Sequence, residues 1–147
     1  MDLYSGVGAI GLSISDLART VVGVEVNREA VEDAIGNAKL NGIRNARFHA
    51  GGVEVLLGKL SSLLRSEAPR SAAAVLDPPR AGCSKDILKV LLSPALGRIV
   101  YVSCNPATFA RDADWLSRHG WSLRAVQPVD LFPQTSHIET VGLFDRP

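Results

Sequence analysis

The chain has 147 residues, of which 46% are hydrophobic and 21% charged, and its formal net charge is +1. This composition predicts one globular domain with its own core, and the near-neutral charge provides no broad basic face for nucleic acid. The two cysteines and three histidines lack metal-ligand spacing, and no apolar run is long enough to cross a membrane. Two cysteines make no disulfide framework and the N-terminus does not resemble a signal peptide, so we expect a cytoplasmic protein. We also expect it to hold no metal and to be a monomer.

The chain begins with a short strand and a glycine-rich turn. Asp2-Leu3 is a strand remnant, residues 4–11 read Tyr-Ser-Gly-Val-Gly-Ala-Ile-Gly, and a helix is expected over 9–17. Glycines at this spacing let the backbone approach a ligand in front of a helix N-terminus. The pattern alone is weak, because it fits a dinucleotide site, a nucleoside site or a turn without a ligand. A first strand shorter than the usual ~5–6 residues indicates a fragment that lacks part of that strand and upstream domains.

An acidic residue ends the second predicted strand. Residues 20–26 form a near-continuous apolar run in which Glu25 is the only charged residue. A carboxylate at the carboxyl end of the second strand can accept hydrogen bonds from both hydroxyls of a ribose. Its distance from the glycines is close to the roughly 20 residues typical of that arrangement. The alternative is a glutamate that caps the next helix, but the strand–glycine–acid context favours the sugar contact.

Apolar periodicity and turn residues predict the remaining elements. We expect helices over 27–40, 53–65, 84–92 and 108–119, and strands over 46–50, 72–77, 99–102, 121–130 and 139–144. No helix separates the last two strands, so they should pair antiparallel. Five βα units followed by a β-hairpin indicate an α/β fold with a doubly wound, mostly parallel sheet.

Two predicted strands end in residues suited to chemistry. Asp77 closes one strand, and Pro78-Pro79 fix an extended exit that would hold a carboxylate in a cleft; a plain turn is the alternative. Cys104 follows the next strand, which Asn105-Pro106 break. A thiol at the carboxyl end of a strand, beside a helix N-terminus, suits a nucleophile, although a buried and inert cysteine is the alternative on this stretch alone. Cys83 is expected to be structural.

Four motifs follow one another along nearly the whole chain. They are Asp2-Leu-Tyr-Ser-Gly-Val-Gly8, Asp77-Pro-Pro-Arg80, Val102-Ser-Cys-Asn-Pro106 and Phe132-Pro-Gln-Thr-Ser-His-Ile-Glu139. Together they resemble the catalytic domain of S-adenosylmethionine-dependent RNA 5-methyluridine (uracil-C5) methyltransferases. The resemblance implies a seven-stranded, Rossmann-like methyltransferase fold over residues 1–147. It also implies S-adenosyl-L-methionine as cofactor and RNA, either tRNA or rRNA, as substrate.

The resemblance further implies roles for individual residues. Cys104 would be the nucleophile and Glu139 the general base. The cofactor-binding residues would be Tyr4, Gly6, Gly8, Glu25 and Asp77, and the substrate-binding residues Asp77, Arg80, Asn105, Pro106 and His137. Members of the family usually carry a cysteine where this chain has Ser5, a departure expected to be harmless. They also carry upstream RNA-binding regions, in some cases with an iron–sulfur cluster.

These residue types suit the implied reaction. C5 of uracil is a poor nucleophile until a thiolate adds to C6, and a thiolate is the best side chain for that addition. The activated C5 then takes the methyl group from the cofactor. A carboxylate removes the C5 proton, so that the cysteine leaves by β-elimination. The target base must first be unstacked to enter the pocket.

Three alternatives stay open. A cytosine-C5 methyltransferase shares the covalent logic, but it generally places a cysteine directly after a proline in the fourth-strand loop, where this chain has Arg80. A nicotinamide-dependent oxidoreductase fits the glycine pattern but gives no role to Cys104 and Glu139. The third alternative is a cofactor-binding fragment that is inactive without the upstream regions.

Overall fold

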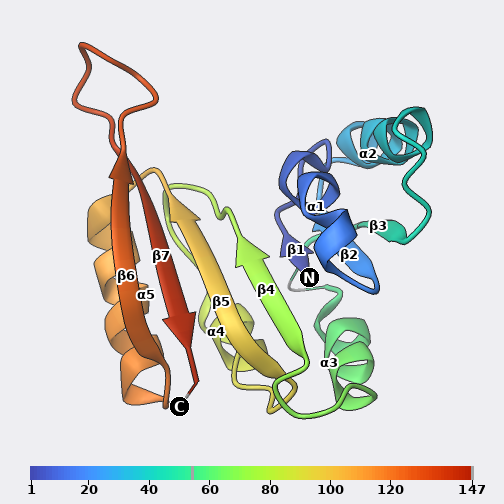
Figure 1. The fold of residues 1–147 in the computed structure, drawn as a ribbon. Coiled ribbons are helices and arrows are strands. Elements are labelled where there is room, and N and C mark those ends of the chain that lie inside the picture. The colour runs from blue at the N-terminus through green and yellow to red at the C-terminus, as the bar shows by residue number, and fades with distance from the viewer. Residues whose placement is uncertain (54, 147) are drawn as a thin grey trace.

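The computed structural model describes residues 1–53 and 55–146. Its centre is a seven-stranded sheet with the strand order β3-β2-β1-β4-β5-β7-β6 (Figure 1). The strands are β1 (Asp2–Leu3), β2 (Val21–Glu25), β3 (Ala46–Ala50), β4 (Ala72–Leu76), β5 (Leu96–Ser103), β6 (Ser122–Val129) and β7 (Glu139–Asp145). Neighbouring strands are parallel except that β7 runs antiparallel to both β5 and β6. The predicted doubly wound, mostly parallel sheet that ends in an antiparallel hairpin is confirmed.

Helices connect the parallel strands. They are α1 (Ala9–Ser13), α2 (Arg28–Leu40), α3 (Leu57–Arg65), α4 (Lys85–Val90) and α5 (Pro106–Arg118), and a short 3₁₀ helix, η1 (Ser15–Leu17), follows α1. Side-chain oxygens of Asn27, Ser84 and Asn105 accept hydrogen bonds from first-turn amides and so cap α2, α4 and α5. A polar side chain that takes up one of the unpaired amides fixes where each helix begins.

Three predicted helices are shorter than expected, among them the helix predicted over 84–92, which is α4 and spans Lys85–Val90. The helix predicted over 9–17 stops at Ser13, whose hydroxyl donates to the carbonyl of Ala9 at 2.6 Å, and the chain then tightens into η1. Such side-chain bonds to the backbone compete with a regular helix. The helix predicted over 53–65 begins only at Leu57. Residue 54 of that range lies outside the described residues.

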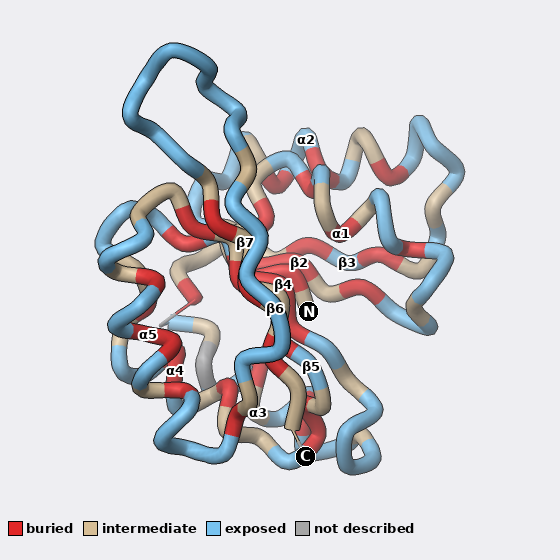
Figure 2. The backbone as a smooth tube through the Cα atoms, turned by 60° about the vertical axis from the view of Figure 1, so that its left-hand side comes forward, coloured by how far each residue is buried: buried red, intermediate tan, exposed pale blue. Residues whose placement is uncertain are grey.

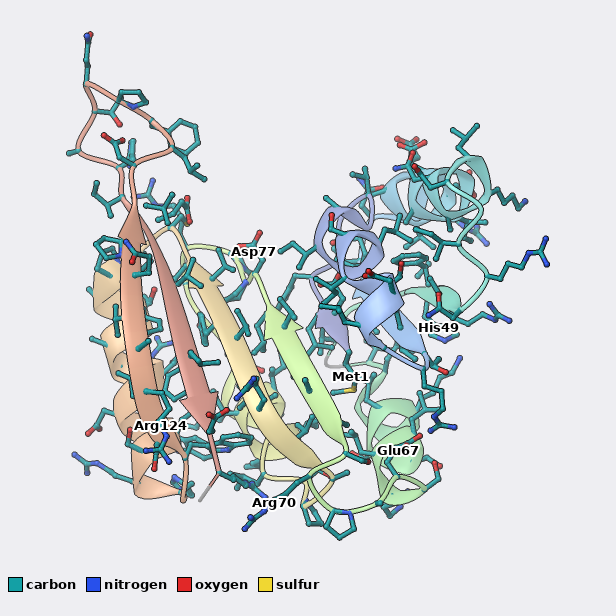
Figure 3. All side chains as sticks on the ribbon, viewed as in Figure 1. Met1, His49, Glu67, Arg70, Asp77 and Arg124 are labelled. Carbon is teal, nitrogen blue, oxygen red and sulfur yellow. The ribbon has the colours of Figure 1, made fainter. Side chains whose placement is uncertain are left out.

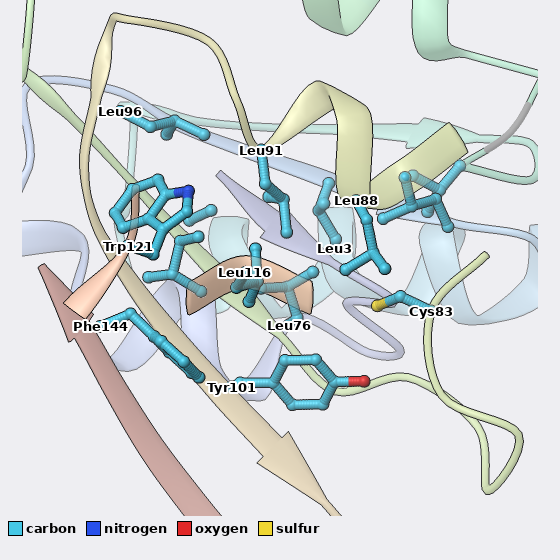
Figure 4. Packing of buried hydrophobic residues seen from close by; sticks show 14 of the residues in the cluster. Leu3, Leu76, Cys83, Leu88, Leu91, Leu96, Tyr101, Leu116, Trp121 and Phe144 are labelled. Carbon is cyan, nitrogen blue, oxygen red and sulfur yellow. The ribbon is translucent and has the colours of Figure 1, made fainter. Parts of the chain in front are cut away.

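The helices pack on both faces of the sheet and form two cores. α1 and α2 lie over β2 and β3, around a small core that includes Val31, Ala34 and Phe48. The larger core packs α3, α4 and α5 against the sheet, and Figure 4 shows some of its buried side chains. Its fully buried members include Leu76, Ile99, Tyr101, Leu116 and Phe144. β6 and the loop that joins it to β7 are exposed along most of their length (Figure 2).

Phe48 fills the space that two glycines leave beneath the glycine-rich turn. A Cβ on Gly23 would lie 2.3 Å from Cδ1 of Phe48, and one on Gly8 would lie 2.9 Å from its Cζ. Gly8 also has a φ of +82°, which favours glycine. The two glycines therefore allow the ring of β3 to support the turn between β1 and α1 from below.

We expect Gly23→Ala to lower the free energy of unfolding by about 1–3 kcal/mol, because the added methyl group collides with a ring that is held on both sides. Gly36→Ala is the matched control, since Gly36 lies in α2 with open space around its Cβ position. The control should raise stability by about 0.5–1 kcal/mol. Urea denaturation of both variants measures this difference, and equal effects would contradict the packing argument.

Candidate active site

The predicted site residues gather at one edge of the sheet, where β1, β4 and β5 end. The register pairs Leu3 with Leu76 and Leu76 with Tyr101, so Tyr4 and Asp77 follow their strands at the same level. Figure 3 shows Asp77 at this end of β4. The strand order changes direction between β1 and β4. Open α/β sheets bind ligands outside the carboxyl ends of their strands at such a point.

The antiparallel pairing of β7 brings Glu139 to the same edge. Ser103 at the end of β5 pairs with Thr140 of β7, and the residues next in this register are Cys104 and Glu139. Cys104 is a partly exposed free cysteine, whereas Cys83 is buried, as predicted for a structural residue. The predicted nucleophile and the predicted base therefore each lie one residue beyond the last pair between these two neighbouring strands.

The glycine-rich turn is tied to the end of β2. The carboxylate of Glu25 accepts hydrogen bonds from the amide of Gly6 at 3.0 Å and from the amide of Asn27 at 2.9 Å. Glu25 therefore links the glycine-rich turn to the residue that caps α2. The N-cap itself is Asn27, so Glu25 does not cap this helix, and its contact with a ribose stays a prediction. Tyr4 and Gly6 have φ values of +64° and +51°, so the turn runs through left-handed conformations.

Sequence reasoning missed the role of Asp2. Its side chain is 2% exposed, and its Oδ2 accepts the amide of Gly11 in α1 at 2.9 Å. Burial raises the pKa of the Asp2 carboxyl, and the charge of Asp77 raises it further, while the Gly11 amide and the N-terminal amino group oppose the shift. An acid directly before the glycine-rich turn was the available signal, because a buried carboxylate needs backbone donors of this kind.

A cavity of about 430 Å³ opens beside the turn. Its walls are Tyr4 after β1, Val26 after β2, Gly52 and Val53 after β3, and the loop of residues 79–84 after β4. Tyr4 lines this cavity, and its contact with the cofactor stays a prediction. Gly6, Gly8, Glu25 and Asp77 are not among the residues that line the cavity.

Asp77 lies one residue beyond β4, which ends at Leu76 rather than at Asp77 as predicted. Its amide donates to the carbonyl of Leu3 at 3.3 Å, so the backbone still follows β1. The carboxylate is exposed at the sheet edge, yet partial desolvation by the surrounding loops raises its pKa.

The segment from Ser103 to Pro106 is held rigidly between β5 and α5. The hydroxyl of Ser103 donates to the carbonyl of Asn105 at 3.0 Å and accepts its amide at 3.1 Å. The side chain of Asn105 caps α5 through the amide of Ala107 and donates to the carbonyl of Arg80. The prediction that the helix begins at Thr108 is wrong, because Pro106 occupies its first position, where no N–H is required.

The loop between β6 and β7 extends beyond the sheet (Figure 1). His137 is exposed, and its amide donates to Thr135 Oγ1, whose hydroxyl donates to the carbonyl of Phe132. Arg80 and Pro106 are also exposed. The predicted substrate-binding residues other than Asn105 are therefore exposed.

Among residues 1–53 and 55–146, no group of three or more histidine, cysteine, aspartate or glutamate side chains could hold a metal ion. No helix in the same ranges is long and apolar enough to span a membrane.

Comparisons with known proteins agree with this geometry. Two uncharacterized RNA methyltransferases, of Gloeobacter violaceus and Enterococcus faecalis, are each 47% identical to the chain over 146 residues. These residues make up 99% of this chain, 30% of the Gloeobacter protein and 31% of the Enterococcus protein. The structure of Pyrococcus abyssi tRNA (uracil-54, C5)-methyltransferase in complex with S-adenosyl-L-homocysteine matches with a TM-score of 0.78 and 33% identity, over 97% of this chain and 33% of that one. The chain thus spans about a third of the length of these relatives.

The strand order and the position of the cavity at the strand ends are those of a Rossmann-like methyltransferase. An rRNA methylase of Streptococcus thermophilus shares that fold with a TM-score of 0.74 at only 14% identity. Residues 1–146 match the tRNA (uracil-5-)-methyltransferase family, and the chain belongs to this family. The family predicted from the four motifs is confirmed.

We expect Asp2→Asn to change the pH dependence of stability. The pKa of Asp2 is raised above its ordinary value of 3.8, so the folded chain holds this proton more tightly than the unfolded chain does. The resulting stabilisation is complete below that value and is lost as the pH rises through the raised folded-state pKa. Asp2→Asn keeps an oxygen for the Gly11 amide, and should therefore match the wild type in acid and become progressively more stable than it toward neutral pH.

Unfolding free energies of both proteins at a series of pH values measure this difference. Asp16→Asn, at an exposed position in η1, is the control. A difference between Asp2→Asn and the wild type that is independent of pH would contradict the effect of burial on Asp2.

Proposed function

We propose that the chain catalyses S-adenosylmethionine-dependent methylation of uracil C5 in RNA, through a covalent bond between Cys104 and C6 of the base. The observation that supports this proposal is the pairing of Ser103 with Thr140, because Cys104 and Glu139 are the next residues at the ends of these two strands. Family membership and the uracil-C5 specificity of the Pyrococcus abyssi relative support the same reaction.

The residues at the strand ends fit S-adenosyl-L-methionine. Gly6 and Gly8 leave the backbone of the turn open to a ligand, and the apolar cavity between Tyr4, Val26 and the 79–84 loop suits a flat heterocycle. Glu25 is fixed by two amides and keeps lone pairs for the hydroxyls of a ribose. When bound, the cofactor supplies an electrophilic methyl group.

Cys104 and Glu139 divide the covalent chemistry between them. The thiolate of Cys104 adds to C6 of uracil, so that the electrons of the C5–C6 double bond make C5 nucleophilic. C5 takes the methyl group and then carries both a methyl group and a proton. The carboxylate of Glu139 removes that proton, the double bond re-forms, and the sulfur leaves C6 as a thiolate.

The neighbouring residues would orient the base. Asp77 lies between the glycine turn and Cys104, where a carboxyl with a raised pKa can bond to the uracil edge or to the cofactor. Arg80, Pro106 and His137 would contact the nucleotide from exposed positions. Asn105 contributes to the same loop through its bond to the carbonyl of Arg80.

The proposal also covers the surroundings of the reaction. Residues 1–147 form the catalytic domain, and the family's other RNA-binding regions, which lie outside it, select the target uridine in tRNA or rRNA. The protein acts as a monomer in the reducing cytoplasm, where Cys83 and Cys104 form no disulfide.

RNA that contains 5-fluorouridine tests the nucleophile. Fluorine at C5 cannot be removed as a proton, so the adduct should accumulate when the chain is mixed with this RNA and S-adenosylmethionine. A denaturing gel should show a band shifted by the RNA. Cys104→Ala should abolish both this band and methyl transfer, while S-adenosyl-L-homocysteine still binds.

Cys83→Ala is the matched control and should form the adduct as the wild type does. RNA with 5-fluorocytidine tests the cytosine alternative, and trapping on cytidine alone would refute the uracil assignment. A wild-type chain that binds the cofactor product but forms no adduct would support the binding-competent fragment instead.

Glu139→Gln tests the base. We expect the release of 5-methyluridine RNA over many turnovers to fall by about 10²–10⁴-fold, because addition and methylation proceed but the C5 proton stays in place and the sulfur cannot leave C6. A covalent protein–RNA adduct should therefore accumulate on ordinary uridine RNA, visible on the same gel. Glu32→Gln, exposed on α2, is the control. Lost activity without an adduct would assign Glu139 another role.

A further inference from the structure

The loop that follows β4 is held by side chains of α5. Asn105 Nδ2 and Thr108 Oγ1 both donate to the carbonyl of Arg80, at 3.2 and 3.1 Å. One turn further along, Arg111 Nη2 donates to the carbonyls of Ala81 at 3.0 Å and Cys83 at 3.3 Å. Because this loop belongs to no strand or helix, its backbone groups depend on these side chains for partners.

Asp112 completes the anchor from inside the protein. Its side chain is 1% exposed, and its Oδ2 accepts the amide of Cys83 at 2.8 Å and the hydroxyl of Tyr101 at 2.7 Å. Its Oδ1 accepts Arg111 Nε at 2.8 Å. The buried charge is thus compensated by a cation and two further donors, as a buried carboxylate requires.

The space around this pair leaves little freedom. A Cβ on Gly82 would lie 2.6 Å from both Arg111 Nη2 and Asp112 Oδ2, and Gly82 has a φ of +77°. Figure 4 shows the hydroxyl of Tyr101 directed toward Cys83 at the inner side of the loop. The loop and the helix therefore fit together in one arrangement only.

This arrangement connects the two halves of the proposed site. Residues 79–84 form one wall of the 430 Å³ cavity. The helix that holds them begins directly after Cys104, and its cap, Asn105, binds the same loop. A shift of the loop against α5 would move the cavity wall relative to the thiol.

We infer that Arg111 and Asp112 are positioning residues, which set the wall of the cofactor cavity relative to Cys104. The inference rests on the proposed function, in which that cavity holds part of S-adenosylmethionine. Neither residue touches the reacting atoms. Their effect follows from geometry, since a misplacement of about 1 Å can cost a group-transfer reaction about 10²-fold.

A pair of substitutions separates this role from general stability. Arg111→Met keeps the apolar stem but removes the donors to Ala81 and Cys83, and it leaves the charge of Asp112 without its cation, so it should also lower the melting temperature. Adding Asp112→Asn removes that charge and retains an oxygen for Tyr101 and Cys83. The double variant should recover most of the melting temperature, and it should still bind S-adenosyl-L-homocysteine about tenfold more weakly than the wild type in calorimetry.

The exposed ion pair of Arg118 and Asp114 on the same helix provides the matched control. Arg118→Met with Asp114→Asn should leave both the affinity and the melting temperature unchanged. Wild-type affinity in the Arg111→Met, Asp112→Asn variant would overturn the inference.

Amide exchange of residues 80–83 gives a second readout that needs no cofactor. Faster exchange confined to this loop in the Arg111→Met, Asp112→Asn variant supports the anchor, and unchanged exchange refutes it. If the wild-type chain itself fails to bind S-adenosyl-L-homocysteine, the proposed function fails, and exchange alone decides whether the pair holds the loop.

Discussion

The antiparallel pairing of β7 with β5 is the constraint on which the site depends. A parallel strand would bring its carboxyl end to this edge of the sheet, but β7 brings its first residue, Glu139, to the end of β5. The core fixes the register, because Ile99 pairs with Phe144 and both are fully buried. A slip of one residue would turn Phe144 out of the core and move Glu139 away from Cys104.

Aromatic packing makes such a slip still more costly. Phe109 of α5 packs edge-on against Tyr101, with ring centroids 5.5 Å apart, and also contacts Phe144. A Cβ on Gly142 would lie 2.4 Å from Phe109, so only glycine lets α5 lie this close to β7. The packing that stabilises the fold thus also determines which residues meet at the strand ends.

The features that sequence predicted are those encoded locally. Apolar periodicity places the strands, the glycine spacing marks the turn, and the lack of a helix before Glu139 predicts the hairpin. Pro106 misled the prediction because proline both breaks strands and starts helices, and only the cap at Asn105 distinguishes the two. The roles predicted for Cys104 and Glu139 came from the family motifs. The strand register that brings both residues to the same edge of the sheet depends on tertiary packing, which the sequence does not reveal.

Long-range polar contacts were beyond sequence reasoning. Asp112 lies at an ordinary polar position of a helical pattern, and nothing near it indicates that its partner is the amide of Cys83, 29 residues away. Asp2 differs, because its place directly before the glycine-rich turn was an available signal, although its burial depends on the approach of α1 to β1. Buried polar groups find partners wherever the fold supplies them, so their identity depends on tertiary structure.

The acidic residues of the site differ in how many hydrogen bonds the protein itself donates to their carboxylates. Glu25 is held by two amides, so its orientation is established before a ligand arrives, which lowers the entropic cost of binding. Asp77 and Glu139 accept no side-chain hydrogen bond within the described part of the chain, and desolvation raises the pKa of Asp77. The part of the site assigned to the cofactor is therefore prearranged. In the part assigned to the uracil, the carboxylates of Asp77 and Glu139 are not held by hydrogen bonds from the described residues of the protein. In the proposed reaction, this difference suits Glu139 to take the proton from C5, because an acid held by fixed amides would be a weaker base.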